Sequence, residues 1–214
     1  VEKWFGTMPA SKKPALVKVP APTIKRTEVT VTDAFAKLPQ ISFSWHSPAR
    51  YAEGDAELDI LGNVLDTEGP GRLYKTLVYD KQLAQNVSAG QSGRQFSGIF
   101  EVNVTLRTGA NMDEVKKIVF DTIAQLTKEV ATDREIARTV TRREASTIRS
   151  LESIFTRAEV LHAYNHYLGD TNKITWDLDR YRTTTADKVR AAAAKYLTPD
   201  RVVMITTQPT GAAK

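Results

Sequence analysis

Alternation of hydrophobic and polar residues predicts four strands in the first half of the chain. Segments 27–32 and 40–46 alternate with a period of two, and Pro48 ends the second of them. Segment 85–92 is a further predicted strand, and segment 98–107 has the clearest alternation of all. The apolar residues of this last segment are Phe100, Val102, Val104 and Leu106. We expect these four side chains to be buried beneath helices.

Apolar residues spaced three and four apart predict helices in the remaining segments. The predicted helices are 55–65, 72–79, 112–130, a long helix over 132–168 with a bend near residue 150, 176–181 and 186–197. Asn111 and Thr132 each precede a Glu by three residues, which is the spacing of a capping box at a helix start. A fifth strand is predicted at 202–206.

This order of elements indicates an α+β fold. Two pairs of sequential strands are each followed by helices, and the strands have one apolar face. We therefore predict a two-layer sandwich, in which one mixed or antiparallel sheet is covered on one face by helices.

The N-terminal segment is predicted to be a linker. Four of the nine prolines occur within the first 22 residues, and proline cannot donate to a helix or a central strand. Residues 1–6 resemble the end of a helix that stops at Gly6. We expect residues 1–26 to be a linker or the tail of a preceding domain, 27–208 a single domain, and 209–214 a disordered tail. The chain starts at Val1, so a processed product or a piece of a longer polypeptide is expected.

Charge and composition exclude several classes of function. The net charge of +5 is carried by residues 1–26, which hold six basic residues and one acidic residue, whereas the rest of the chain is balanced. A basic stripe with interleaved aromatic residues is missing, so no nucleic-acid partner is predicted. No cysteine is present, which excludes disulfides and thiol nucleophiles. No apolar run is long enough for a membrane span. The compartment is left open between the cytoplasm and a bacterial periplasm.

Two histidines are the only candidates for metal ligands. His162 and His166 are four residues apart on a predicted helix, so both rings can share a face. Ala163 stands where the H-E-x-x-H motif has its glutamate, and the inverted motif H-x-x-E-H is absent. The favoured interpretation is two polar histidines near a helix C-terminus. We therefore predict no metal ligand and no catalytic residue in this chain, with an unrelated zinc enzyme built on the pair as an alternative.

Other polar residues are expected to be solvated. The four acidic residues at alternate positions in 53–59 are expected to lie on different helix faces, so no carboxylate dyad is predicted. His46 is expected to be exposed or at the rim of the sheet. Arg134, Arg138 and Arg142 share one helix face, which is either solvated or a basic wall for an acidic segment of a partner.

Segment 71–90, GRLYKTLVYDKQLAQNVSAG, resembles the insulinase/pitrilysin family of zinc peptidases. It resembles the non-catalytic domain that follows the zinc-binding domain, with a Gly-rich turn, an Arg-Leu-Tyr motif, a helix and then a strand. The resemblance implies the metallopeptidase fold shared with LuxS and the processing peptidases. It also implies a domain that packs on a zinc domain and forms part of the wall of a chamber around an unfolded peptide. The parent polypeptide or complex would then be a zinc metalloendopeptidase.

The resemblance also implies candidate substrate contacts. The family has an Arg and a Tyr seven residues apart that hold substrate, and these positions fall on Val78 and Gln85, so both side chains are missing here. Gly71 and Arg72 in the Gly-rich turn are the other candidates. Zinc is expected in a partner catalytic domain, in the same polypeptide or in another subunit. A catalytically dead stand-alone structural or peptide-binding subunit of the same fold is the alternative.

Overall fold

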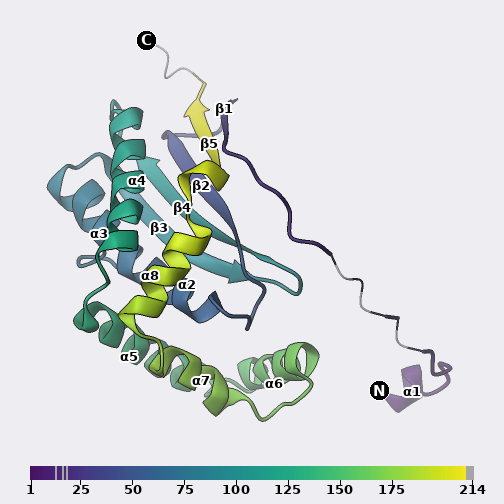
Figure 1. Ribbon diagram of the computed structural model, residues 1–214. Coiled ribbons are helices and arrows are strands. Elements are labelled where there is room, and N and C mark those ends of the chain that lie inside the picture. The colour runs from purple at the N-terminus through teal and green to yellow at the C-terminus, as the bar shows by residue number, and fades with distance from the viewer. Residues whose placement is uncertain (13, 16, 18, 211–214) are drawn as a thin grey trace.

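A five-stranded mixed sheet forms one layer of the protein (Figure 1). The computed structural model describes residues 1–12, 14, 15, 17 and 19–210. The strands are β1 (Thr27–Asp33), β2 (Gln40–Ser47), β3 (Ala84–Gly93), β4 (Gly98–Leu106) and β5 (Val202–Pro209). Their order in the sheet is β1-β5-β2-β4-β3. Only the β1–β5 pair is parallel, and the other neighbours are antiparallel.

Helices form the second layer, and α2, α4 and α8 lie over the sheet (Figure 1). The helices that follow the arm are α2 (Asp55–Asp66), α3 (Arg72–Tyr74), α4 (Met112–Lys128), α5 (Asp133–Ser150), α6 (Ile154–Leu168), α7 (Ile174–Arg182) and α8 (Ala186–Tyr196). A short 3-10 turn, Pro199–Arg201 (η2), leads into β5. The predicted α+β fold is confirmed. None of the helices in the described part of the chain is long and apolar enough to cross a membrane.

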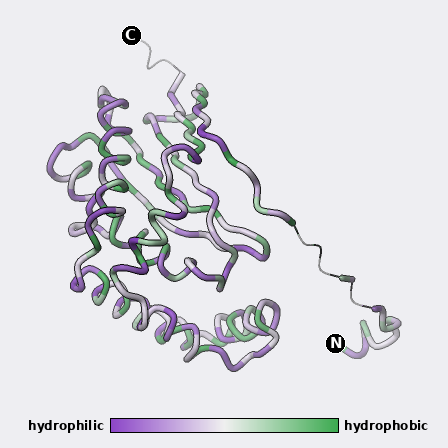
Figure 2. The backbone as a smooth tube through the Cα atoms, in the orientation of Figure 1, coloured by the Kyte–Doolittle hydropathy of each residue, from purple (hydrophilic) through white to green (hydrophobic). Residues whose placement is uncertain are grey.

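The hydrophobic core lies between the two layers. Phe100, Val102, Val104 and Leu106 are all fully buried, as predicted from their alternation. Trp45 lies opposite Phe100 in the β2–β4 register, and its indole Nε1 donates to the Thr198 carbonyl oxygen at 3.0 Å. Figure 2 shows hydrophobic and hydrophilic residues interleaved along the same strands and helices, as expected where each element has one buried side.

Two predicted helices differ in detail from the structure. The long helix over 132–168 is not bent but interrupted at residues 151–153, and Ser153 caps the new helix α6 by accepting from Thr156 N. The capping box of Thr132 at the start of α5 is present. The predicted helix 72–79 is one α-helical turn followed by a π-helical segment, Lys75–Asp80.

The N-terminal arm runs away from the domain to a short helix, α1 (Glu2–Phe5) (Figure 1). The arm joins the domain where Arg26 N donates to the Asp200 carbonyl oxygen at 2.7 Å. At the other end, Pro209 still belongs to β5 and Thr210 N donates to Asp33 O, so the sheet extends into the predicted tail. Residues 211–214 of that tail lie outside the described residues.

Candidate functional site

Gly71 and Arg72, two of the predicted substrate contacts, lie in a turn that an ion pair connects to α5. The Arg72 guanidinium donates from Nε and Nη2 to the two carboxylate oxygens of Glu135, both at 2.9 Å. This bidentate pair, together with the cap at Thr132, lowers the pKa of Glu135 to about 2. A Cβ at Gly71 would lie 2.5 Å from Thr67 N, so only glycine fits the turn. Both residues thus hold the turn in place.

The other two predicted contacts, Val78 and Gln85, lie apart from this pair. Val78 is in the π-helical segment and packs against the hydrophobic core. Gln85 is exposed on the edge strand β3, at a bulge in the β3–β4 register. It lines a shallow hollow with Phe35 and Thr105. The structure therefore does not gather the four residues into one site.

The histidine pair lies on the exposed side of α6. The rings of His162 and His166 are stacked with centroids 6.2 Å apart. No cluster of three or more His, Cys, Asp or Glu side chains that could hold a metal ion occurs among residues 1–210 where the structure describes them. Among the described residues the arrangement therefore offers two imidazoles without a third protein ligand, whereas a catalytic zinc site needs three.

A buried charge cluster joins α2 to α7, and the sequence analysis missed it. Arg180 donates from both terminal nitrogens to Asp55 Oδ2 at 3.1 Å, and Tyr181 OH donates to Asp59 Oδ2 at 2.6 Å. The prediction that these carboxylates lie on different faces was wrong, because Asp55 and Asp59 are four residues apart and share one side of α2. Burial is the largest influence on Asp59 and raises the pKa of its carboxyl group. The four-residue spacing of Asp55 and Asp59 was the signal that could have identified the cluster.

Aromatic rings extend this cluster to α6. Tyr51, whose φ of 65° is left-handed, has its ring centroid 5.9 Å from that of Tyr164 and 6.0 Å from that of Trp176. The Arg180 guanidinium lies 5.1 Å from the Tyr51 ring centroid, and Tyr164 OH donates to Asp177 at 3.0 Å. Arg180 pairs with Asp55 and Asp177, and Arg143 of α5 lies 3.7 Å from Asp59. The cluster therefore links α5 and α7 to α2, and the Tyr164 hydroxyl links α6 to α7.

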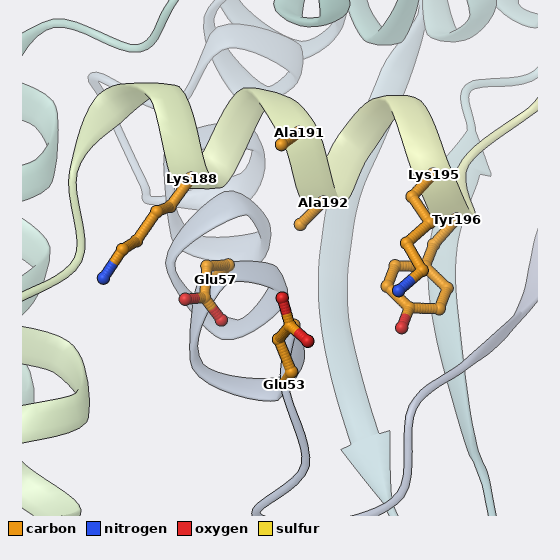
Figure 3. A pocket seen from close by; sticks show the side chains of 8 residues that line it. Glu53, Glu57, Lys188, Ala191, Ala192, Lys195 and Tyr196 are labelled. Carbon is orange, nitrogen blue, oxygen red and sulfur yellow. The ribbon is translucent and has the colours of Figure 1, made fainter.

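Two cavities of about 260 and 430 Å³ lie beside α8, and Lys195 and Tyr196 contribute to the lining of both. Figure 3 shows Glu53 and Glu57 facing the side of α8 that carries Lys188 and Lys195. The remaining residues of the first cavity are Gly54, Ala191 and Ala192. The second cavity is lined by Ala21–Ile24 of the arm, residues 46–49 at the end of β2, Phe96 and Arg201.

Two polar side-chain atoms at the end of β2 lack hydrogen-bond partners among the described residues. His46 Nε2 and Ser47 Oγ are buried, and neither has a hydrogen-bond partner in the described part of the protein. His46 is half-buried at the end of β2, at the rim of the sheet, where it lines the second cavity. Gly54 has a φ of 94°, and a Cβ there would lie 2.9 Å from the Tyr196 ring, so glycine allows this ring to pack close to the start of α2.

Comparisons with known proteins relate this fold to zinc peptidases. The family model of the peptidase M16 inactive domain matches residues 1–143. The uncharacterized zinc protease YmxG of Bacillus subtilis is 24% identical over 201 residues, which cover 94% of this chain and 48% of that protein.

Two solved structures share the fold. A protease from Helicobacter pylori superposes with a TM-score of 0.82 at 18% identity, covering 97% of this chain and 51% of that chain. A peptidase M16 inactive domain from Pseudomonas fluorescens superposes with a TM-score of 0.73 at 24% identity, covering 95% and 48% of the two chains. The chain therefore spans about half the length of these relatives.

The family match covers more than half of the chain and agrees with the resemblance of segment 71–90. The fold and the absence of a metal-ligand cluster among the described residues are compatible with that match. The chain therefore belongs to the peptidase M16 family, the insulinase/pitrilysin zinc peptidases, and corresponds to the inactive domain of that family.

Proposed function

We propose that this chain is the non-catalytic domain of a bacterial-type zinc metallopeptidase, packs on the zinc-bearing domain and forms part of the wall of a peptide-enclosing chamber. The observation that carries the proposal is the match to an inactive domain in a chain that spans about half of a zinc protease. The zinc-bearing domain would be supplied by the same polypeptide or by a partner subunit. A catalytically dead stand-alone subunit of the same fold is the alternative, in which the zinc domain acts in trans.

Exposed apolar side chains support a packing role. Ile148 at the end of α5 and Ile154 and Phe155 at the start of α6 are 63%, 78% and 72% exposed. Large apolar side chains at such a junction are costly to leave in water and favour burial against another protein surface. We assign the α5–α6 junction to the contact with the zinc domain.

The sheet edges support peptide contact. β1 and β3 are the outermost strands, so each has one side of its backbone that pairs with no other strand of the sheet. An extended peptide can add to such an edge through main-chain hydrogen bonds. This mode of contact needs no metal and no catalytic side chain from this chain.

The test combines the chain with a zinc-bearing M16 domain from the same genome, fused upstream or mixed in trans. Alone, the chain should bind no stoichiometric zinc and cleave no peptide. Together with the zinc domain it should raise cleavage of a fluorogenic peptide above that of the zinc domain alone. Ile154→Asp and Phe155→Asp should weaken the association of the two proteins, whereas Lys128→Asp on α4 should not.

Variants of the histidine pair test whether this chain supplies any zinc ligand. The variants His162→Ala and His166→Ala should leave the zinc content of the assembly unchanged, because the zinc ligands belong to the other domain. Loss of one zinc equivalent in either variant would contradict the proposal and favour an unrelated zinc site on α6. Cleavage that is the same with and without the chain would contradict the proposed role in the chamber.

A further inference from the structure

Four arginines form a basic stripe along one face of α5. Arg134, Arg138, Arg142 and Arg149 follow one another at intervals of four, four and seven residues, so their side chains share one side of the helix. The basic stripe is about 22 Å long, since each residue of a helix adds about 1.5 Å. Arg138 is half-buried and the other three arginines are exposed. Figure 1 shows α5 together with α6 and α7 at the lower end of the molecule.

The charge of the basic stripe is not neutralised within the described part of the chain. All ion pairs among the described residues involve other side chains. Glu135 and Glu144 of α5 pair with arginines of α3 and α7 instead. Burial raises the pKa of Asp66 on α2, and Arg142 lowers it to a smaller extent, so these two groups interact only at longer range. The basic stripe is therefore open to a negative charge on another molecule.

The basic stripe is unfavourable for the chain by itself. Like charges four residues apart destabilise a helix, and Arg134, Arg138 and Arg142 form two such pairs. Arg138 Nη2 is also shielded from solvent and has no hydrogen-bond partner among the described residues, which is a further cost. A negative charge placed beside the stripe would relieve the repulsion between the guanidinium groups, and it need not touch the shielded nitrogen to do so.

The surroundings of the basic stripe favour a folded protein as the partner. Arg149 directly follows Ile148, which is 63% exposed, and the exposed Ile154 and Phe155 begin the next helix. Guanidinium groups bind carboxylates through two parallel hydrogen bonds, and apolar side chains beside them favour a surface that excludes water. Residues 27–214 are balanced in charge, unlike a domain that binds nucleic acid. The matching partner is a protein surface that is acidic next to an apolar patch.

We propose that the basic stripe of α5 docks on an acidic surface of the zinc-bearing domain, beside the apolar contact of the α5–α6 junction. This inference rests on the proposed function and names the chemistry of the surface that the zinc domain presents. In such an interface the apolar junction supplies the burial, whereas charge complementarity orients the two proteins and speeds their association. An acidic peptide and a nucleic acid are the competing occupants.

The experiment measures binding of the full chain to the zinc-bearing M16 domain of the same genome by surface plasmon resonance, at about 50 and about 500 mM NaCl. Arg134→Gln, Arg138→Gln and Arg149→Gln should each weaken binding about 3-fold at low salt, chiefly through slower association. The triple variant should weaken it about 30-fold and lose most of the salt dependence. Arg190→Gln removes the same charge from an exposed position on α8 and is the matched control, which should bind like the wild type.

Two further measurements separate docking from other roles of the basic stripe. The free triple variant should melt at the wild-type temperature or slightly above it, because repulsion within α5 is reduced. A structural role would instead lower its melting temperature and overturn the proposal. A labelled DNA duplex and a labelled poly-glutamate peptide are titrated separately with the wild type and the triple variant. Either probe would overturn the proposal if it bound as tightly as the zinc domain and lost that binding in the triple variant.

The outcomes also separate this proposal from the proposed function. Equal affinity of the wild type and the triple variant for the zinc domain would overturn the role of the basic stripe. If Ile154→Asp still weakened the association in that case, the proposed packing on the zinc domain would stand without the stripe. If the wild type did not associate with the zinc domain at either salt concentration, both proposals would be overturned.

Discussion

The bidentate pair between Arg72 and Glu135 allows a quantitative prediction for Glu135→Gln. Glutamine keeps the shape of the side chain and can still cap α5 from the third position, but it removes the charge. The carboxylate is 14% exposed and its arginine partner 22% exposed, so the pair is largely shielded from water. The substitution therefore tests the ion pair rather than the packing around it.

The magnitude follows from the pKa of Glu135, which falls from an ordinary 4.5 to about 2 in the folded protein. Converted through linkage, that difference corresponds to at most about 3 kcal/mol of stability. Residual exposure to solvent reduces this figure, and we expect a loss of about 1–2 kcal/mol near neutral pH. For a chain of this length the melting temperature should fall by about 2–8 °C.

The lowered pKa of Glu135 also fixes the direction in which the stability difference changes with pH. Because the folded-state pKa is depressed, the stabilisation is present above about pH 4.5 and is lost as the pH falls toward the folded-state pKa of about 2. Urea denaturation of the wild type and of Glu135→Gln should therefore differ most near pH 7, differ by roughly half as much near pH 3, and converge only below about pH 2.

The matched control is Glu114→Gln. Glu114 is also the third residue of a helix, and it pairs with Lys81 at 2.7 Å, but both side chains are 40% or more exposed. This exposed pair should contribute about 0.5 kcal/mol or less. An equal cost of the two substitutions, or a cost of Glu135→Gln that does not change with pH, would refute the reasoning.

Three further predictions concern the core, the charge cluster and the arm. Phe100→Ala should cost about 3–5 kcal/mol in urea denaturation because the ring is fully buried, whereas Phe35→Ala, at a 93% exposed site, should cost almost nothing. Tyr181→Phe should cost about 1–3 kcal/mol by removing the hydrogen bond to Asp59. Since the pKa of Asp59 is already raised by burial, this cost should grow as the pH rises through its folded-state pKa, and a pH-independent cost would argue against the mechanism. Limited proteolysis should cut first within residues 7–23, because the prolines of this segment prevent helix formation and strand pairing and its lysines repel one another. A first cut inside residues 133–168 would contradict the interpretation of the arm as a linker.

Local periodicity determined most of the elements of this protein. The alternation of segment 98–107 predicted the buried residues of β4, and the spacing at Thr132 predicted the capping box of α5. Both depend on residues that are neighbours along the chain, and backbone geometry alone decides which side chains share a face. Segment 71–90 was sufficient to indicate the family, because its turn, helix and strand are contiguous in the sequence and form one motif that can be recognised without the fold.

The local sequence indicated an irregularity near residue 150 but not that it separates two helices. The stretch 132–168 has helical spacing throughout, yet the structure separates α5 from α6 at residues 151–153. There Ser153 offers a cap to α6, and the ring of Tyr164 contacts that of Tyr51 in the segment before α2.

Tertiary structure alone decided which distant residues meet. β5 lies between β1 and β2, although it is the last strand of the chain. Arg180 reaches Asp55 across 125 residues, and His46 of β2 and Lys195 of α8 line the same cavity. Periodicity defines the faces of a strand or helix but not its neighbours, because pairing depends on the closure of long loops and on packing over the whole core.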